Sequence, residues 1–398
     1  MEAAVRTGAA CATTRRSRAG GGPTNRRPAI ADRSVTRRTI GTLNRNVDNP
    51  LPTVALGARA GESVKWAGSA DEHRPACARA SGYGRDVPGI HPLLDDNVKR
   101  AIERAASDHL GRRWLSRSFT DLNDRASHPC GVFHGQPFSV FAKLGLEVEA
   151  ADQFASELSG LAFVRHRAGI ATPTPIGGGL VELERGCLLL FEALPERPPE
   201  ARTRDDWRAI GHTLATLHQV HAGHFGLEGL DGFFGPLRQD NRPVTSNRWV
   251  DFYAERRIAP RLHSAVDAGH LPPDLAADIE RLLGRLPTLC GPEPPPALLH
   301  GDAQQHNFVS TDAGAVVIDV APYFGHPELD LALVDYFDPV PDDVFDAYRD
   351  IAPIDPGFAQ RRELWRLFGY LAVVTVDGHK PFGRRMLRRL ADAVRSYV

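Results

Sequence analysis

The sequence has no long hydrophobic run and no clustered cysteines. Nowhere in the 398-residue chain do apolar residues continue for the roughly 18–20 positions that a membrane-spanning helix needs. The five cysteines are scattered, with no CxxC pair, so neither a zinc site nor a disulfide scaffold is indicated. Free cysteines suit a reducing compartment. We therefore expect a cytoplasmic protein that does not engage a membrane.

Lysine is scarce, with four lysines against 44 arginines. Residues 1–50 hold ten arginines and three acids, whereas the remainder has eight more acids than basic residues. An acidic folded part argues against nucleic acid as the main partner. Residues 1–88 are rich in Arg, Ala and Gly and show no apolar period, so they are predicted to form a disordered tail. A basic targeting segment and an over-extended gene start are the alternatives.

Beyond residue 91 the apolar residues alternate between strand-like and helix-like spacing. The ranges predicted as strands are 131–134, 138–143, 174–181, 187–192, 307–310 and 315–318. The ranges predicted as helices are 92–110, 150–168, 203–220, 249–262, 273–289, 341–350, 361–375 and 382–397. Residues 223–248 are predicted to be a long loop. The chain should therefore form an α+β fold with two lobes, a β-rich one at 89–194 and a helical one at 195–398.

A set of polar residues surrounds the last two predicted strands. His300 and Asp302 belong to an HGD sequence, Asn307 follows five positions after the Asp, and Asp319 twelve positions after the Asn. A strand–turn–strand hairpin would bring Asn307 and Asp319 to one mouth, close to the Asp302 loop. Phosphoryl transfer from ATP needs one carboxylate to take a hydroxyl proton, and an amide and a second carboxylate to hold Mg²⁺. The spacing favours that chemistry over an ordinary polar loop.

Lys143 and Glu157 are candidates for binding the nucleotide in the same phosphoryl-transfer reaction. Lys143 ends the predicted strand 138–143, and Glu157 lies in the middle of the predicted helix that follows. The lysine would hold the ATP phosphates and the glutamate would fix its direction. The alternative is a solvent-facing lysine and a surface glutamate. Further on, Glu192 and Leu194 are predicted to enter the hinge between the lobes, where backbone groups would bind the adenine.

The loop expected to approach the ATP phosphates has no glycine between Arg117 and Cys130. Close approach of backbone to phosphate usually requires glycine. Asn123, Ser127 and backbone amides are the candidates to replace it. Weakened nucleotide binding and a donor other than ATP are the other interpretations.

The chain resembles the fructosamine kinase (ketosamine 3-kinase) family of aminoglycoside-phosphotransferase-like kinases over roughly residues 91–398. The shared segments include PPPALLHGD, IDVAPYFGHPELDLALVDYF and NRWVDFYAERRIAPRL. The resemblance implies a protein-kinase-like fold, ATP and Mg²⁺ as cofactors, and phosphorylation of a sugar hydroxyl on a ketoamine. It implies that Asp302 is the catalytic base and that Asn307 and Asp319 bind the metal. His300 and Asp330 would support the catalytic loop without touching substrate.

The acceptor contacts are expected in residues 225–242 and in the AQQH sequence before Asn307, where the chain departs from the family pattern. An aminoglycoside or other amino-sugar phosphotransferase is therefore an alternative function. A nucleotide-binding pseudokinase is a second alternative, favoured by the missing glycines. Under the first interpretation the partner is a small sugar-amine molecule, and we expect a monomer.

Overall fold

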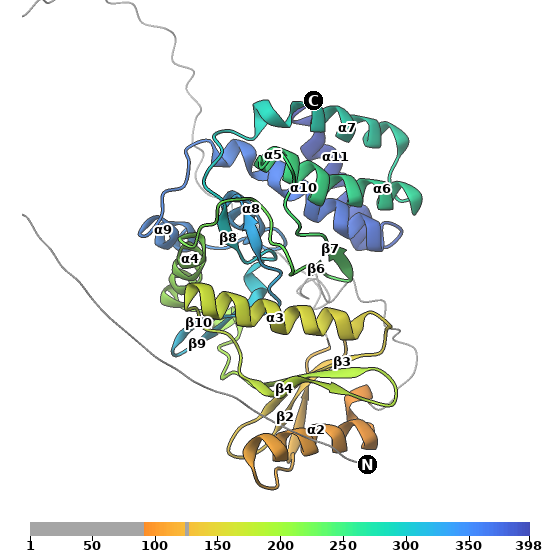
Figure 1. The fold of residues 1–398 in the computed structure, drawn as a ribbon, viewed down its shortest axis with the longest axis vertical. Helices are drawn as coiled ribbons and strands as arrows, with labels where there is room; N and C mark the ends of the chain where they lie inside the picture. The colour runs from red at the N-terminus through yellow and green to blue at the C-terminus, as the bar shows by residue number, and fades with distance from the viewer. Residues whose placement is uncertain (1–90, 124–126) are drawn as a thin grey trace, which may run out of the picture. The chain divides into compact units, whose positions relative to one another are not determined.

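The computed structural model describes residues 91–123 and 127–398 (Figure 1). These residues fall within one compact unit of the chain, and the predicted tail at 1–88 lies outside them. The first part of the unit is an antiparallel sheet with the strand order β1-β2-β3-β5-β4. Its strands are β1 (Ser118–Asp121), β2 (Cys130–His134), β3 (Val140–Gly145), β4 (Pro175–Glu182) and β5 (Cys187–Glu192).

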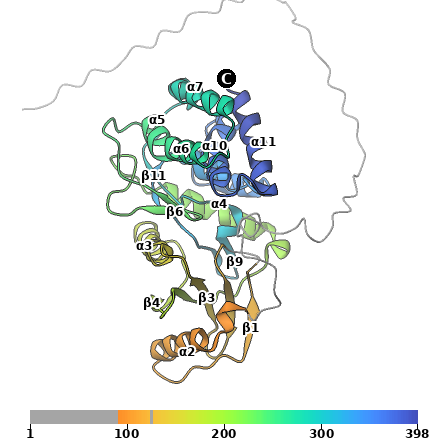
Figure 2. The same ribbon diagram turned by 90° about the vertical axis from the view of Figure 1, so that its right-hand side faces the viewer.

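Two helices cover opposite faces of this sheet, α2 (Asp96–Leu110) and α3 (Ala150–Ala168) (Figures 1 and 2). Side chains of β5 point alternately to the two faces. Leu188 and Leu190 join the core beneath α2, whereas Leu189 and Phe191 join the core beneath α3. A short 3-10 turn, η1 (Pro92–Leu94), precedes α2. Because both faces are buried, β5 is an almost continuous apolar run.

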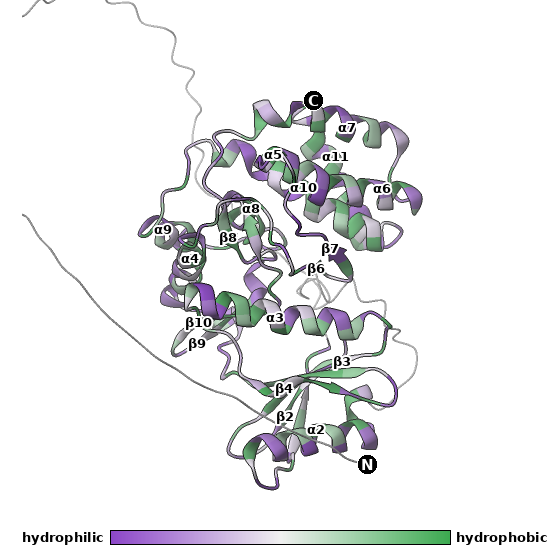
Figure 3. Cartoon of the chain, viewed as in Figure 1, coloured by the Kyte–Doolittle hydropathy of each residue, from purple (hydrophilic) through white to green (hydrophobic). Residues whose placement is uncertain are grey.

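The second part is mostly helical. Its helices are α4 (Arg204–His218), α5 (Trp249–Phe252), α6 (Ala259–Asp267), α7 (Pro273–Leu289), α8 (Glu328–Leu333), α9 (Asp343–Arg349), α10 (Phe358–Asp377) and α11 (Pro381–Arg395). The 3-10 turn η2 (Pro199–Ala201) lies between β5 and α4. Thr203 and Asp206 form a capping box that fixes the start of α4. Along helices such as α3, hydrophobic and hydrophilic residues alternate, as expected where one side is buried (Figure 3).

Short strands in the second part hold the loops that contain the polar residues singled out in the sequence. β8 (Ala297–Leu299) pairs with β11 (Tyr323–Gly325), and β9 (Phe308–Thr311) pairs with β10 (Gly314–Val317). The β9–β10 hairpin lies where the sequence predicts one. Between β8 and β9 the chain makes a 3-10 turn, η4 (Gln305–Asn307). The loops after β8 and β10 are thus held at one place by two small sheets.

Some sequence predictions are wrong in detail. The predicted loop at 223–248 contains a hairpin, β6 (Gly232–Phe234) with β7 (Leu237–Gln239). Strands of three residues are too short to show a period of two. The predicted helix at 249–262 is interrupted by a π-helical turn, η3 (Tyr253–Ile258), before it continues as α6. Helix α8 and strand β11 were not predicted either. They are also short, with six and three residues.

The described residues also limit two other classes of site. None of their helices combines the length and apolar character that crossing a membrane requires. Within residues 91–123 and 127–398, no three His, Cys, Asp or Glu side chains group in a way that could hold a metal ion.

Candidate active site

The loop that follows β8 presents Asp302. Gly301 has a left-handed backbone, with φ of 84°, and a Cβ at this position would collide with the carbonyl group of Ala321. The Ala321 amide donates a hydrogen bond of 2.9 Å to the carbonyl of His300. A residue larger than glycine would therefore push the two segments apart and move Asp302.

Asp330, on α8, fixes the same loop from within the core. Its side chain is fully buried, at 0 % exposure. Its carboxylate accepts hydrogen bonds from the backbone amides of His300 (2.6 Å) and Gly301 (3.1 Å). The ring of His218, on α4, lies 3.2 Å from the same carboxylate. These are contacts that a loop-supporting residue should make, and they hold the backbone on the N-terminal side of Asp302.

The β9–β10 hairpin places Asn307 and Asp319 beside Asp302. The Asn307 side-chain amide donates a 2.8 Å hydrogen bond to the backbone carbonyl of Asp302. The Asn307 carbonyl accepts from the amide of Ile318 over 3.0 Å, which ties the two ends of the hairpin together. Asp319 itself has φ of 51°. A non-glycine residue in the left-handed region is strained, and such strain concentrates at functional sites.

Lys143 reaches this group from the sheet. Its ammonium lies 3.1 and 3.3 Å from the two carboxylate oxygens of Glu157, on α3. It also contacts the carboxylate of Asp319. Lys143 is 7 % exposed, so the predicted alternative of a solvent-facing lysine is wrong. The structure thus brings together Lys143, Glu157, Asn307, Asp302 and Asp319.

The Lys143 ammonium contacts the carboxyl groups of both Glu157 and Asp319, and this shifts the pKa values of all three groups. Burial raises the pKa of Glu157 to about 8, against the attraction of Lys143. Burial would also raise the pKa of Asp319, but the charge of Lys143 together with hydrogen bonds from Lys143 and Glu157 lowers that pKa. The two carboxylates hold the pKa of Lys143 above its ordinary value despite burial. At neutral pH Glu157 therefore keeps its proton, while ionised Asp319 balances the charge of protonated Lys143.

Asp302 is poised to exchange a proton near neutral pH. Burial raises the pKa of its carboxyl to about 7, and the neighbouring Asp319 charge adds to the rise. Gln304 opposes this rise, because its side-chain amide donates to both Asp302 oxygens, over 3.3 and 3.2 Å. The sequence did not indicate this role for Gln304. Its only signal was its place two residues after Asp302.

The predicted hinge residues lie at the last position of β5 (Glu192) and two positions after it (Leu194). The Glu192 carboxylate lies 3.3 Å from the ring of His109, on α2, so its side chain faces that helix. The carbonyl of Leu194 accepts from the amide of Glu196 over 2.8 Å. No hydrogen bond from the Leu194 amide to another described residue is formed. That amide is a free donor in the segment that joins the two lobes.

The glycine-free loop between β1 and β2 is closed by side chains. The Asn123 side-chain oxygen accepts from the amide of Cys130 over 2.9 Å, so it is engaged within the loop. His128 lies 3.1 Å from the Gln153 side-chain oxygen, and Gln153 also donates to the carbonyl of Gly235 over 3.3 Å. Gln153 thus bridges this loop and the β6–β7 hairpin. The sequence did not single out His128 or Gln153, because the bridge joins three distant segments.

Two other histidines, His326 and His306, are held by neighbouring side chains. His326 packs against the rings of Trp249 and Trp365, with centroids 6.1 and 5.0 Å away. Burial lowers the pKa of His326 to about 3, so it is neutral at physiological pH. His306 lies 3.3 Å from a carboxylate oxygen of Asp338, at the edge of the site. Neither contacts the cluster around Asp302.

Comparison with known proteins decides the family. Residues 98–392 match the fructosamine kinase family. The chain belongs to this family. A candidate ketoamine kinase of Synechocystis is 35% identical over 191 residues, which cover 46% of this chain and 62% of that protein. A candidate ketoamine kinase of Escherichia coli is 30% identical over 207 residues, covering 52% and 70%. The matched region thus spans a little under two thirds of the Synechocystis protein's own length.

Solved structures agree with this fructosamine kinase assignment. A candidate fructosamine-3-kinase from Thermobifida fusca has a TM-score of 0.61 and 31% identity, and the match covers 78% of this chain and 99% of that one. A mutant of aminoglycoside phosphotransferase APH(4)-Ia, in complex with ADP and hygromycin B, shares the fold with a TM-score of 0.51 and 17% identity, over 74% of this chain and 98% of that one. The predicted family, the bilobal kinase-like fold and the enzyme class of ATP-dependent phosphotransferases are confirmed.

Proposed function

We propose that this family member transfers the γ-phosphoryl group of ATP to a hydroxyl of a ketoamine, a sugar joined to an amine. The observation that carries the proposal is the convergence of Lys143, Asp302, Asn307 and Asp319 from four separate segments. The names of its relatives in Synechocystis and Thermobifida fusca support the acceptor class. Phosphoryl transfer depends mainly on positioning and charge, which this arrangement supplies.

Asp302 acts as the base in this proposal. Its carboxylate takes the proton of the acceptor hydroxyl as that oxygen bonds to the γ-phosphorus, and the bond to the β-phosphate oxygen breaks to release ADP. A pKa of about 7 suits a base that works near neutral pH. The brace from Asp330 and the hydrogen bonds from Gln304 keep the carboxylate in place.

Asn307 and Asp319 would hold Mg²⁺. The Asn307 nitrogen is committed to the Asp302 carbonyl, which leaves its oxygen as the ligand atom. The Asp319 side chain is 36 % exposed, against 9 % for its partner Lys143, so it is accessible to a ligand. Mg²⁺ is commonly bound by one or two protein ligands plus substrate phosphates, and this set fits. When bound, the ion neutralises charge on the phosphate oxygens.

Lys143, oriented by Glu157, would bind the phosphates of ATP. The hinge at Glu192 and Leu194 would bind the adenine through its backbone, and the free Leu194 amide is the donor available for a ring nitrogen. The β1–β2 loop supplies its contacts without glycine. Side chains that close the loop on itself, such as Asn123, can fix its amides in place of glycine flexibility.

An acceptor panel tests the proposed function. Purified full-length protein is expected to consume ATP with Mg²⁺ when a fructosyl-amine is added, and to do so more efficiently than with any aminoglycoside. Steady-state kcat/KM values for each acceptor make the comparison. Higher values for aminoglycosides would replace the proposed acceptor class. Thermal stabilisation by Mg-ATP without phosphorylation of any acceptor would instead indicate a pseudokinase.

Gln304→Leu is expected to shift the pH dependence of kcat/KM upwards by as much as about one pH unit. The wild-type rate should rise with pH through about 7, because only ionised Asp302 accepts a proton. Removing the Gln304 amide removes hydrogen bonds to the ionised form and so raises the pKa of Asp302. A pH–rate profile of both proteins checks this. An unchanged midpoint would mean that Asp302 does not control the rate.

The same pKa has an opposite consequence for folding stability. The carboxyl of Asp302 holds its proton more tightly in the folded state than in the unfolded state, where its pKa is about 3.9. Its contribution to the free energy of unfolding therefore falls as pH rises from about 4 to about 7. The activity profile and the stability profile should thus run in opposite directions across this window.

A further inference from the structure

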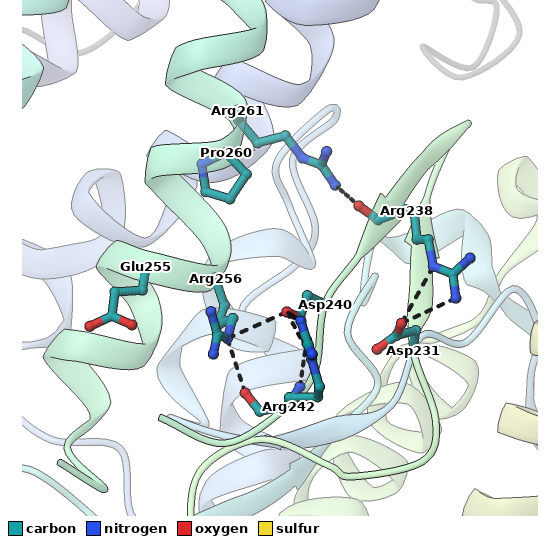
Figure 4. A pocket seen from close by; sticks show the side chains of 8 residues that line it. All are labelled: Asp231, Arg238, Asp240, Arg242, Glu255, Arg256, Pro260 and Arg261. Atoms are coloured by element: carbon teal, nitrogen blue, oxygen red, sulfur yellow. Dashed lines mark hydrogen bonds and ion pairs between the residues drawn. The ribbon is translucent and has the colours of Figure 1, made fainter. Parts of the chain in front are cut away.

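A charged cavity lies between the β6–β7 hairpin and the helix that contains the π turn (Figure 4). Its volume is about 420 Å³. Four arginines and three acids line it, so one positive charge is in excess. We call it the arginine pocket and define it by Asp231, Arg238, Asp240, Arg242, Arg256 and Arg261.

The acids of the arginine pocket are already engaged. Asp231 pairs with Arg238 over 3.3 Å. Asp240 pairs with Arg242 over 2.7 Å and lies 3.7 Å from Arg256. These pairs are visible across the cavity in Figure 4. Beyond these pairs the lining holds two more charged side chains, Arg261 and Glu255, of which only Arg261 is buried.

Two buried arginines at this place have no carboxylate partner within residues 91–123 and 127–398. Arg257 and Arg261 are 1 % and 8 % exposed and lie one helical turn apart. Arg257 donates to the carbonyl of Asp240 over 3.0 Å and to the Asn241 side-chain oxygen over 2.6 Å. Arg261 donates to the carbonyl of Arg238 over 2.6 Å. A buried charge without a counter-ion is costly, so the pair calls for an anion.

The electrostatics of Arg261 agree with this reading. Burial lowers its pKa to about 10, and the positive charge of Arg257 adds to the effect. Arg261 is the member of the pair that lines the cavity. Arg256 and Arg257 belong to the π turn, and π turns are frequent at functional sites. An anion in the cavity would meet Arg261 directly, with Arg257 behind it.

The hairpin wall of the pocket borders the phosphotransfer site. Asp231 accepts through its carbonyl from the Ser156 hydroxyl of α3 over 2.8 Å, one residue before Glu157. A Cβ on Gly232 would lie 3.0 Å from the Cβ of Ala321, which follows Asp319 by two positions. The pocket is therefore built on the segments that carry the metal ligand and the lysine's partner.

We propose that the arginine pocket binds a carboxylate on the amine half of the acceptor, so that free glycated amino acids are the preferred substrate class. The inference rests on the proposed function. The guanidinium fork matches a carboxylate with two parallel hydrogen bonds. A ketoamine on a protein side chain has no nearby carboxylate and would gain nothing from the pocket. Under this proposal the carboxylate occupies the pocket while the sugar lies at the base, on the side where the hairpin meets Ala321.

Two acceptors that differ only in the carboxylate test the inference: fructosyl-glycine and fructosyl-methylamine. Their Kd values, measured by calorimetry on the full-length protein, and their kcat/KM values are compared. Wild-type protein is expected to favour fructosyl-glycine by about tenfold to a hundredfold in both. Arg261→Gln should reduce both ratios towards one, because glutamine keeps a donor for the hairpin carbonyl but loses the charge. Arg281→Gln, which removes an exposed arginine of α7 paired with Asp278, is the matched control and should keep the wild-type ratios.

The outcomes separate this inference from the proposed function. Equal Kd values for the two adducts in wild-type protein, or an unchanged ratio in Arg261→Gln, would show that the arginine pocket does not bind the carboxylate. Tighter binding of fructosyl-glycine without turnover of either adduct would support carboxylate binding by the pocket and would overturn the proposed kinase function. Arg256→Gln provides a second reading should Arg261→Gln fold poorly, since its side chain is partly exposed and reaches the backbone carbonyl of Arg242 over 3.1 Å. It should lower the ratio as well.

Discussion

Asp302→Asn is expected to lower kcat by about a thousandfold, within the range of about 10²–10⁴ for loss of a general base. The substitution keeps the size of the side chain but removes both its charge and its ability to take a proton. The KM for ATP should change little, because Lys143, Asn307 and Asp319 are untouched. Single-turnover rates at pH 8, with saturating ATP and fructosyl-glycine, measure the effect.

Folding cannot account for that loss if the prediction is right. Burial holds the pKa of Asp302 near 7, so ionised Asp302 opposes folding at pH 8, and the Asn variant should be at least as stable as the wild type. Asp312→Asn is the matched control. Asp312 lies in the turn between β9 and β10, its side chain is 97 % exposed, and its loss should leave kcat unchanged. Turnover near the wild-type rate in Asp302→Asn would remove Asp302 from the mechanism.

Asp330→Ala is expected to cost about 3 kcal/mol of the free energy of unfolding. The buried carboxylate accepts from two backbone amides and contacts the ring of His218. Alanine leaves both amides without this partner and leaves the ring only its contact with the Tyr348 hydroxyl. The loop that carries Asp302 would lose its support, so kcat should fall too. Urea denaturation at pH 7, followed by circular dichroism, measures the stability change, and kcat is measured on the folded fraction.

The control for Asp330→Ala is a carboxylate on the surface. Asp346, on α9, pairs with Arg349 and its side chain is 58 % exposed. Exposed pairs contribute about 0–1 kcal/mol, so Asp346→Ala should be nearly neutral. A cost below about 1 kcal/mol for Asp330→Ala would show that the loop at 300–302 is held by other contacts.

Strong local signals made several elements predictable from sequence. Strand β5 was predicted at 187–192 because an unbroken apolar run cannot face water on either side, and it occupies those residues. Helix α3 ends at Gly169, whose φ of 67° is the left-handed cap that glycine favours. The grouping of Asn307 and Asp319 was also predictable from local sequence. The two residues flank a tight hairpin, and a hairpin brings the residues at its two open ends close together.

Other features depend on contacts between distant segments. The β6–β7 hairpin has strands of three residues and is stabilised largely by what it packs against. Arg257 and Arg261 were missed because a charged side chain is normally interpreted as solvent-facing, and only the fold shows that these two are buried. The bridge from His128 through Gln153 to Gly235 joins three segments, and no pattern within one of them predicts it.

Phosphoryl transfer from ATP to a ketoamine is proposed to depend on Lys143, Asp302, Asn307 and Asp319. Phosphorus NMR of the reaction observes this transfer directly. Full-length protein is mixed with Mg-ATP and fructosyl-glycine, and the spectrum is followed over time. A growing phosphate monoester signal on the adduct is expected, matched by ADP, and no such signal with Asp302→Asn. Release of inorganic phosphate alone, or the same monoester from the Asp302→Asn protein, would contradict it.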